Sequence, residues 1–442
     1  MRLAAAALAL LAFAPPAEPS VPPEALASAI ESVVAPLAER DVFGGVVLVA
    51  RGDEVLFEKA WGMANQEFSV PNRPDTRFRI ASITKRFTML LFQQLAAEKK
   101  LSLDDPLAKW APAFPKADRI TIAHLLNHKS GIRDPESLRR TIPASLTAEE
   151  VVALLAKTPL ASEPGETYSY TTANYAVLAY VLERVEGSPF AAVVRRRLYA
   201  PAGMTDAGDL DTISVVPRLA SGYMPDPLAA RGLAVSGPED TSWKIGGGSG
   251  YATARDLLRF HRALAAGKLL PAGADPLSVF PPTKARGRRV ISSSGAFPGA
   301  NARVLYFPDE GVTVVVLSNN YANVTGPIAD SAAAAAFGES VRPIEPPARG
   351  EAAPLDPRIA GSYLVESFPM PVTLEASHGK AVAVWSPARV SAVLRIGPDE
   401  WFMPLDWATL KLVPGEGGAP ELVVTAPWIG KPIKVTRVPQ KP

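Results

Sequence analysis

Cysteine is absent from this sequence of 442 residues, which excludes disulfide bonds and thiolate metal sites. Histidine is scarce as well, with four residues, so few ligands remain for a metal centre of another kind. Neither sign of charge dominates, because 46 Lys and Arg face 44 Asp and Glu. The net charge of +2 therefore gives no electrostatic reason to expect nucleic acid or an anionic membrane surface as a partner.

Long apolar runs are also missing, except at the start of the chain. There, Arg2 precedes the apolar run Leu3–Phe13, which is too short to span a bilayer. A small-residue cleavage site ends at Ala14, and Ala17 offers a second one. This pattern predicts that residues 1–20 are a signal peptide, with a retained anchor as the alternative. The mature protein would be secreted or periplasmic and would have no membrane span.

The rest of the chain has the composition of an ordinary globular protein, with 48% hydrophobic and 20% charged residues. Residues 21–342 predict one large domain. Residues 343–354 are rich in proline and poor in apolar side chains, which is typical of a linker. Residues 355–442 contain short alternating strands with Gly, Pro and Asp turns, which indicates a small all-β domain.

The large domain mixes helical and strand patterns along the chain. Two apolar strands flank an Arg-Gly-Asp turn in 44–62, and three more strands are expected in 290–319. Helices are expected at 23–40, 82–99 and 325–337, with mostly helical structure in 120–270. These patterns predict an α+β fold in which helices pack on an antiparallel sheet. We expect the N-terminal hairpin to lie beside the C-terminal strands.

The stretch RIASITKRFTML places a lysine where a helix should not favour one. A helix N-terminus carries partial positive charge, yet Lys85 follows Ser82 at the start of the expected helix. Residues i and i+3 share a helix face, so the two side chains point the same way. Burial and the helix field lower the pKa of a lysine, which can then take the proton of a serine hydroxyl. The same field favours an oxyanion beside Ser82, so this position suits acyl transfer.

The S-x-x-K pattern alone has little specificity. It arises by chance roughly once or twice in a chain of this length. A second match, Ser377-His378-Gly379-Lys380, falls in an expected turn of the β domain. Other segments must therefore decide between the two serines.

Five segments together resemble the serine β-lactamase and penicillin-binding protein superfamily, in its class C-like branch. The resemblance spans about 40 to 340, and the region from 355 onward resembles the lipocalin-like accessory domain of this branch, which implies a barrel-like arrangement. The segments are FRIASITKRFTMLLFQQLAAEKKLSLDDPL (78–107), ITIAHLLNHKSGI (120–132), PGETYSYTTANYAVLAYVLERVEG (164–187), GGGSGYATARDLLRF (246–260) and SSSGAFPGANARVLYFPDEGVTVVVLSN (292–319).

The resemblance implies a serine hydrolase of the esterase, D-amino acid peptidase or amidase type. It would form a covalent acyl-enzyme on Ser82, act on a small-molecule or peptide substrate and need no metal or organic cofactor. Lys85 matches the lysine of the first motif, and Tyr170 matches the tyrosine of the family's Y-x-N motif. A phenol acts as a base at neutral pH only if a nearby cation depresses its pKa, and Lys85 would supply that charge. We expect Lys85 and Tyr170 to titrate as a pair, so neither is assigned as the single base.

The third motif matches in part. Gly295 and Ala296 agree with the family, and the Ala296 N–H is expected to complete the oxyanion hole with that of Ser82. Ser293, however, stands where the family has Lys or His, a cation that usually meets a substrate carboxylate. Without it, neutral esters or amides become more plausible substrates than β-lactams or D-Ala-D-Ala peptides. Charge could instead come from the upstream arginines 286, 288 and 289.

The second motif departs from the family too. Thr172 replaces its asparagine, and Asn174, two residues on, could partly compensate. These departures leave one rival open, namely a catalytically impaired protein of the same fold that binds peptidoglycan or peptide ligands. Retention of Ser82, Lys85 and Tyr170 together argues for the enzyme.

Two further patterns in the segment 124–131 suggest other sites but fit them poorly. His124 and His128 have the i, i+4 spacing of zinc ligands, but the glutamate of H-E-x-x-H is missing between them. Lys129-Ser130-Gly131 resembles the K-T-G motif, yet it precedes the tyrosine motif and belongs to the NHKSG turn. We therefore expect neither a zinc site nor a third motif here.

Overall fold

The computed structural model describes most of the chain after the expected signal segment, which lies outside the described residues. The described residues are 21–134, 145–211, 213–226, 229, 232–237, 240–271, 274, 276–341, 343–344, 350–365, 371–386, 389–415, 420–427 and 431–438. Within these ranges, no helix combines the length and apolar character that crossing a membrane requires.

A six-stranded antiparallel sheet forms the centre of the large domain. Its order is β10-β11-β12-β13-β1-β2, so the N-terminal hairpin lies beside the C-terminal strands, as predicted. Strand β1 pairs along its whole length with β13, from Gly45 opposite Ser318 to Arg51 opposite Val312. The bounds are Gly45–Arg51 (β1), Glu54–Trp61 (β2), Thr283–Ala285 (β10), Arg288–Phe297 (β11), Ala300–Phe307 (β12) and Val312–Ser318 (β13).

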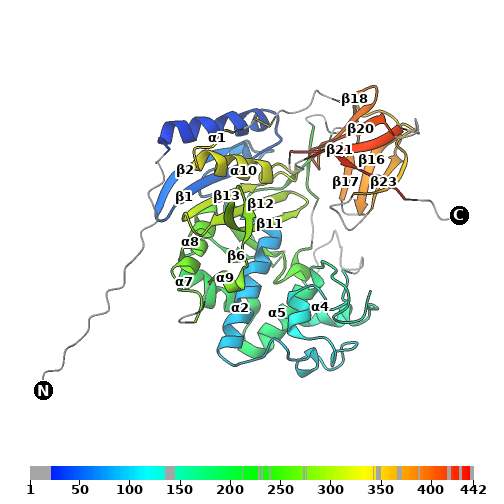
Figure 1. The fold of residues 1–442 in the computed structure, drawn as a ribbon. Coiled ribbons are helices and arrows are strands. Elements are labelled where there is room, and N and C mark those ends of the chain that lie inside the picture. Colours follow the sequence, from blue (N-terminus) through cyan, green and yellow to red (C-terminus); the bar gives the residue numbers. More distant parts are fainter. Residues whose placement is uncertain are drawn as a thin grey trace, which may run out of the picture.

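Both faces of this sheet are covered, which explains why its central strands are continuous apolar runs. Along β1, Val46 and Leu48 join one hydrophobic core, whereas Val47 and Val49 join the other. Helices α1 (Pro23–Ala38) and α10 (Thr325–Ala336) pack together over one face (Figure 1). Helices α2 (Thr84–Ala97), α8 (Ala254–Ala265) and α9 (Pro276–Val279) lie on the other side (Figure 1). The predicted α+β architecture is confirmed.

A largely helical part lies beyond α2, away from the sheet (Figure 1). It contains α3 (Ile122–Leu126), α4 (Ala148–Leu155), α5 (Ala173–Glu186) and α6 (Phe190–Val194). The chain then returns through a π-helical turn (Arg195–Tyr199) to α7 (Ala200–Ala202), which packs against α8. From 203 to 253 the described chain forms loops and short strands, so the prediction of helix through 270 was too broad there. Proline and glycine interrupt this stretch repeatedly, which disfavours helix.

Several short strands and 3₁₀ turns complete the large domain. The strands are Met63–Asn65 (β3), Val70–Pro71 (β4), Phe78–Arg79 (β5), Gly208–Asp209 (β6), Tyr223–Pro225 (β7), Leu233–Val235 (β8) and Gly250–Ala252 (β9). The turns are Ala81–Ile83 (η1), Leu107–Lys109 (η2) and Ser242–Lys244 (η5). Strand β9 pairs with both β5 and β6, which brings residues 250–252 beside the start of α2.

The C-terminal region is all-β, as predicted, but it is not a closed barrel. One sheet has the order β17-β16-β15-β14-β23 and the other β18-β19-β20-β21-β22. The stretches VSAVLRI and IKVTRV each resemble one strand in sequence, yet each divides between the two sheets. Val393 and Val435 are the buried residues at these crossings, and both stretches keep the residue types of an uninterrupted strand across the corner.

The two C-terminal sheets share one apolar core and also contact the large domain. Phe402 and Trp407 join the core beneath α1 and α10. The predicted boundaries at 342 and 354 stay predictions. The strand bounds are Gly361–Leu364 (β14), Val372–Ser377 (β15), Lys380–Ser386 (β16), Arg389–Ala392 (β17), Leu394–Gly397 (β18), Glu400–Met403 (β19), Ala408–Pro414 (β20), Pro420–Thr425 (β21), Ile433–Lys434 (β22) and Thr436–Arg437 (β23).

Candidate active site

Ser82 lies in the 3₁₀ turn η1 immediately before α2, and not within the α-helix itself. The preceding Ala81 has φ of 46°, a left-handed conformation that non-glycine residues rarely adopt. Thr84 holds this turn closed, because its Oγ1 donates to Ala81 O at 2.7 Å and accepts from Gly250 N at 3.0 Å. Such local strain is found preferentially at functional sites.

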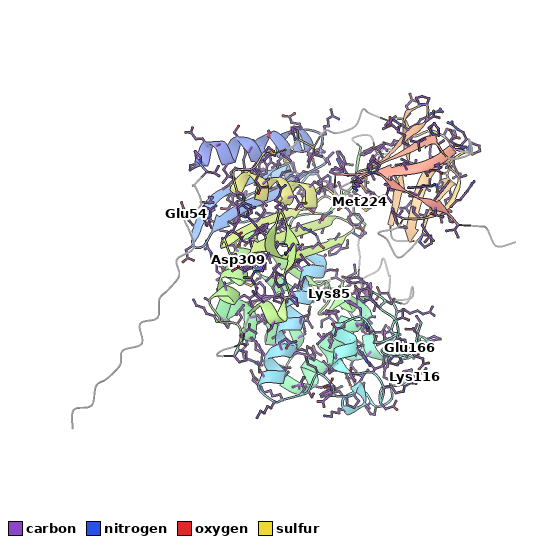
Figure 2. All side chains as sticks on the ribbon, in the orientation of Figure 1. Glu54, Lys85, Lys116, Glu166, Met224 and Asp309 are labelled. Atoms are coloured by element: carbon purple, nitrogen blue, oxygen red, sulfur yellow. The ribbon has the colours of Figure 1, made fainter. Side chains whose placement is uncertain are left out.

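Lys85 is buried beside Ser82, with 5% of its surface exposed. Its Nζ donates to Gly247 O at 2.7 Å and to Ser82 Oγ at 3.1 Å. Burial lowers the pKa of Lys85 to about 7, and the charge of Asp134 opposes this shift only in part. Figure 2 labels Lys85 at the junction where α2 leaves the sheet for the helical part. An amine with a pKa of about 7 is neutral in about half of the molecules at pH 7, and the neutral form can accept a proton.

Tyr170 reaches the same oxygen from the loop that precedes α5. Its hydroxyl donates to Ser82 Oγ at 2.8 Å, and Lys85 Nζ lies 4.9 Å from the centroid of its ring. Tyr170 as a whole is 53% exposed, yet its hydroxyl lies against Ser82 and is desolvated there. Desolvation of that hydroxyl raises the pKa of Tyr170, and the hydrogen bond to Ser82 and the charge of Arg86 lower it less.

The expected depression of the Tyr170 pKa is therefore wrong in direction. The prediction relied on the charge of Lys85, whereas desolvation of the Tyr170 hydroxyl has the largest effect on its pKa and raises it. In the free protein Tyr170 is a protonated phenol at neutral pH, and it donates to Ser82 where a base would accept.

The NHKSG turn holds the segment that carries Tyr170. His128 O accepts from Ser169 N at 2.8 Å, and His128 Nδ1 accepts from Thr171 N at 3.3 Å. The His128 ring also lies against that of Tyr170, with centroids 4.5 Å apart. Burial, aided by Lys85, lowers the pKa of His128 to about 4, so its Nδ1 stays available as an acceptor. His128 is thus a positioning residue that sequence reasoning considered only as a metal ligand.

Asn174 and Thr172, at the altered second motif, both contact other segments of the protein. Asn174 is fully buried, and its Oδ1 accepts from Ser130 Oγ at 2.5 Å, so its amide helps to hold the NHKSG turn. The Thr172 methyl packs on the glycine-rich turn that precedes β9, since a Cβ added to Gly247 would lie 2.9 Å from Thr172 Cγ2. Lys129 is exposed. Its main chain is bonded to His124 O and Gly165 N, so 129–131 form part of the NHKSG turn, as predicted, and not a strand like that of the third motif.

Asp134 is a site residue that the sequence did not reveal. Its Oδ1 accepts from the Thr171 hydroxyl and, at 2.8 Å, from Ala173 N, so it caps the start of α5. Its negative charge raises the pKa of both Lys85 and Tyr170. The carboxylate comes from a loop 39 residues before Ala173, which is why no local capping pattern marked it.

Strand β11 passes directly along the nucleophile turn at Gly295. A Cβ added there would lie 2.1 Å from Ile80 O and 2.8 Å from Ser82 N, so only glycine fits. Ala296, the next residue of β11, is exposed on the strand. The Ser82 amide and the end of β11 thus lie together, which is the arrangement expected of an oxyanion hole.

Ser293 lies on the opposite side of β11 from the exposed Ser294 and Ala296. It is 5% exposed and lines a cavity of about 10 Å³ with Arg86 and His261. Its side chain is thus directed into the interior, and a substrate on the exposed face of the strand would not meet it.

The three arginines upstream of Ser293 are engaged elsewhere. Arg286 and Arg288 pair with Glu339 at 2.7 and 2.8 Å, and Arg289 pairs with Asp309. These partners lie at the end of β11 opposite Gly295. The arginines therefore do not restore a cation at the third motif.

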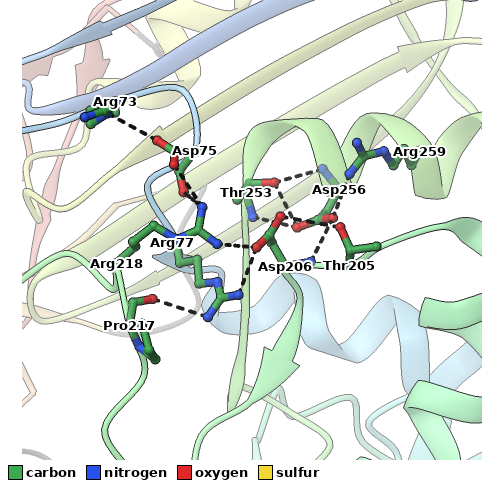
Figure 3. Close-up of polar contacts among 10 residues, drawn as sticks. All are labelled: Arg73, Asp75, Arg77, Thr205, Asp206, Pro217, Arg218, Thr253, Asp256 and Arg259. Atoms are coloured by element: carbon green, nitrogen blue, oxygen red, sulfur yellow. Dashed lines mark hydrogen bonds and ion pairs between the residues drawn. The ribbon is translucent and has the colours of Figure 1, made fainter.

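A network of ion pairs supports the segment that leads to Ser82 (Figure 3). Asp206 accepts from Arg77 at 2.8 Å and also from Arg218, and Arg218 pairs in addition with Asp75 at 2.9 Å. Both arginines lower the pKa of Asp206, with Arg77 contributing most. The main chain of Arg77 is bonded to Arg218 O and Ala220 N, so the network fixes the entry to β5.

Metal ligands do not cluster in the described part of the chain, where no group of three or more His, Asp or Glu side chains could hold an ion. His124 is used locally, because its Nδ1 accepts from Thr121 N at 3.3 Å in a capping box of α3. Ser377, the second S-x-x-K serine, pairs with Lys380 across the β15–β16 hairpin.

The chain is similar in sequence to known proteins of one family. The sequence profile of the family described as Beta-lactamase matches residues 29–338. Esterase EstB of Burkholderia gladioli is 34% identical over 273 residues, which cover 52% of this chain and 67% of the esterase.

Two solved structures share the fold. The D-amino acid amidase of Ochrobactrum anthropi SV3 has a TM-score of 0.61 at 24% identity, over 70% of this chain and 98% of the amidase. The octameric penicillin-binding protein homologue of Pyrococcus abyssi has a TM-score of 0.61 at 20% identity. That match covers 93% of this chain and 99% of the homologue, so it includes most of the C-terminal β region.

Proposed function

Because the chain belongs to the β-lactamase family of serine hydrolases, we propose that it hydrolyses small esters or amides through a covalent acyl-enzyme on Ser82. One observation carries the proposal. Ser82 Oγ is contacted both by the Tyr170 hydroxyl at 2.8 Å and by Lys85 Nζ at 3.1 Å. A serine with two proton-transfer groups on its oxygen has the arrangement that nucleophilic catalysis needs.

Acylation begins when neutral Lys85 accepts the Ser82 proton. The Ser82 oxygen forms a bond to the substrate carbonyl carbon, and the carbonyl oxygen becomes an oxyanion. The Ser82 N–H and the Ala296 N–H would donate to this oxyanion, where such donors are worth about 10² to 10³ in rate. Gly295 makes this possible, because any side chain there would push β11 away from the Ser82 amide.

The leaving group departs with a proton from Tyr170. Its phenol is protonated at neutral pH and lies next to the reacting oxygen, so it is suited to protonating an alkoxide or amine as the carbon–heteroatom bond breaks. Lys85, now charged, can return the proton to Tyr170. Water then attacks the acyl-enzyme, gives its proton to the same pair and releases the acid and Ser82. The two groups act as one relay, so neither is the base alone.

The surroundings of β11 favour neutral substrates. Ser293 replaces the family's cation and is directed into the interior, and the arginines 286, 288 and 289 are held by carboxylates. None of these four positions thus provides a cation on the exposed face of β11 to meet a substrate carboxylate. The similarity to esterase EstB and the shared fold with a D-amino acid amidase fit this chemistry.

The test is covalent labelling together with a hydrolysis screen. We expect a fluorophosphonate to add one adduct on Ser82, detected by mass spectrometry of the intact protein and its peptides. Ser82→Ala should lose the adduct and more than about 99.9% of turnover, and its melting temperature should change by only a few degrees. Ser377→Ala, the matched control at the second S-x-x-K, should keep both.

The screen should pair p-nitrophenyl esters and D-amino acid amides with cephalosporins and D-Ala-D-Ala peptides. Hydrolysis of the neutral substrates alone would support the proposed substrate class. If no substrate turns over and no probe labels Ser82, the altered motifs Thr172 and Ser293 would instead indicate a binding protein of this fold.

Export is also part of the proposal, and its support is the apolar segment with a small-residue cleavage site in residues 1–20. N-terminal sequencing of the protein from fractionated cells would test it. A mature terminus near residue 15 or 18 is expected, and an uncleaved chain in the cytoplasm would contradict it.

A further inference from the structure

Arg86 follows the site lysine and lies behind the third-motif strand. Its Nη2 donates to Ser292 O on β11 at 2.9 Å. Its guanidinium carbon lies 5.1 Å from the centroid of the Phe280 ring. A single side chain thus joins the nucleophile helix to the strand that carries Gly295.

Apart from Arg86, the residues that line the cavity beside it carry no charge at neutral pH. It has a volume of about 10 Å³, and its polar lining residues are Arg86, His261 and Ser293. His261 Nδ1 is buried without a partner, and burial lowers its pKa to about 4, so the ring is neutral at neutral pH. Within the described part of the chain, no carboxylate forms an ion pair with Arg86.

Arg86 is half-buried, and a charge that is partly removed from water without a counter-charge loses part of its hydration. Its charge acts on the site nevertheless, since it lowers the pKa of Tyr170 and Tyr175 against the effect of burial. Ser293, the residue that should carry the cation of the third motif, borders the same cavity. A positive charge on the neighbouring helix thus borders the position where the family has its cation.

Building on the proposed hydrolase function, we infer that Arg86 is a positioning residue that takes the place of the third-motif cation. It holds β11 against the nucleophile turn through Ser292 O, and its positive charge acts on Tyr170 from behind the strand. From there it cannot contact a substrate carboxylate on the exposed face. Arg86 thus supplies the structural and electrostatic part of the lost cation's role without its part in carboxylate recognition.

The test compares Arg86→Ala, Arg86→Lys and the exchange Arg86→Ala/Ser293→Lys. The exchange removes the large guanidinium and returns a cation to the position where the family has one. Arg51→Ala is the control, since Arg51 likewise donates one bond, 3.2 Å long, to a carbonyl oxygen, that of Ala336, away from Ser82. The readouts are the rate of Ser82 labelling by a fluorophosphonate, kcat and KM for a neutral ester, and melting temperature.

We expect Arg86→Ala to slow labelling and kcat by about tenfold to a hundredfold with little change in KM. This is less than the loss of a direct oxyanion donor, because Arg86 acts through the strand. Arg86→Lys should retain more than Arg86→Ala, and the exchange should recover at least about tenfold of the loss. Arg51→Ala should label at the wild-type rate.

The pH profile separates this role from simple destabilisation. The charged and titratable groups that contact or act on Tyr170 are Lys85, Asp134, His128, Tyr175 and Arg86 itself. Removing the positive charge of Arg86 should move the alkaline limb of kcat/KM to higher pH, and Arg51→Ala should leave it in place.

Three results would overturn the inference: wild-type labelling by folded Arg86→Ala, an unmoved alkaline limb, or an exchange variant no faster than Arg86→Ala. Failure of the proposed hydrolase function would differ, since wild-type protein itself would not label.

Discussion

Lys85→Met offers a quantitative test of the buried amine. Methionine has a similar length and no charge, so it removes the cost of burying an ammonium group at a position that is 5% exposed. The pKa of Lys85 falls from an ordinary 10.5 to about 7, and one pH unit corresponds to about 1.36 kcal/mol. Below pH 7, where both folded and unfolded chains carry the charge, the cost to folding is therefore about 5 kcal/mol.

The sign of the pH dependence follows from proton counts. Between pH 7 and about 10.5 the unfolded chain holds a proton on Lys85 that the folded protein lacks, so wild-type stability rises with pH. The cost should be about 4 kcal/mol at pH 7 and about 1.5 kcal/mol at pH 9.5. Both pH 7 and pH 9.5 lie above the range in which His128, with a pKa of about 4, titrates in the folded protein.

Part of the stability that Lys85→Met gains by losing the buried amine is offset by a lost hydrogen bond. Methionine leaves Gly247 O without its donor, and an unsatisfied buried carbonyl costs about 1 to 3 kcal/mol. This offset does not depend on pH. The stability difference between Lys85→Met and wild type should therefore favour the variant at pH 7 and shrink by about 3 kcal/mol at pH 9.5.

Urea denaturation of both proteins at the two pH values measures this difference. Lys85→Met should be nearly inactive, so the test depends on stability alone. A stability difference that is the same at pH 7 and pH 9.5 would show that Lys85 does not titrate between them. The assignment of its neutral amine as proton acceptor would then fail.

Three further predictions concern the neighbours of Lys85. Tyr170→Phe should cost about 10² to 10⁴ in kcat/KM, and adding Lys85→Ala should cost far less than the product of the two single losses; multiplicative losses would refute a shared relay. Asp134→Asn should lower the pKa of Lys85 further, because its charge now raises that pKa, and the acid limb of kcat/KM should move to lower pH; an unmoved limb would contradict this coupling. Ser293→Lys alone should lower the melting temperature, because it places a second cation beside Arg86 in a cavity of about 10 Å³. It should not raise kcat/KM for substrates that carry a carboxylate. A tenfold gain in that kcat/KM with unchanged stability would show that the introduced ammonium group reaches the exposed face.

Most of the fold followed from local patterns in the sequence. The apolar runs of β1 and β13 and the turn between β1 and β2 gave the hairpin and its sheet, because period and turn residues are local properties. The split of VSAVLRI at Val393 could not be predicted this way. Its side chains remain apolar across the corner, and only the packing of two sheets decides where one strand ends.

The same distinction between local patterns and long-range contacts applies to the site residues. Ser82 and Lys85 were predictable because their spacing is three residues, and Tyr170 was predictable from its motif and the order of the segments. Asp134 and Arg86 were not, since each acts through contacts with distant segments. The direction of the Tyr170 pKa failed for the same reason, because it depends mainly on the desolvation of the Tyr170 hydroxyl and in part on the distant Asp134, neither of which a local pattern reveals.

The pairing of β1 with β13 bears on how the chain reaches its folded state. Gly45 meets Ser318, so the first hairpin completes the sheet only after about 270 more residues exist. At the usual 5 to 20 residues per second of synthesis, the ribosome needs roughly 15 to 50 s to make them. Throughout that interval the apolar edge of β1 has no partner, and an open edge of this kind invites pairing with another chain. Chains truncated before residue 312 should therefore aggregate or require a chaperone, however well their helices form.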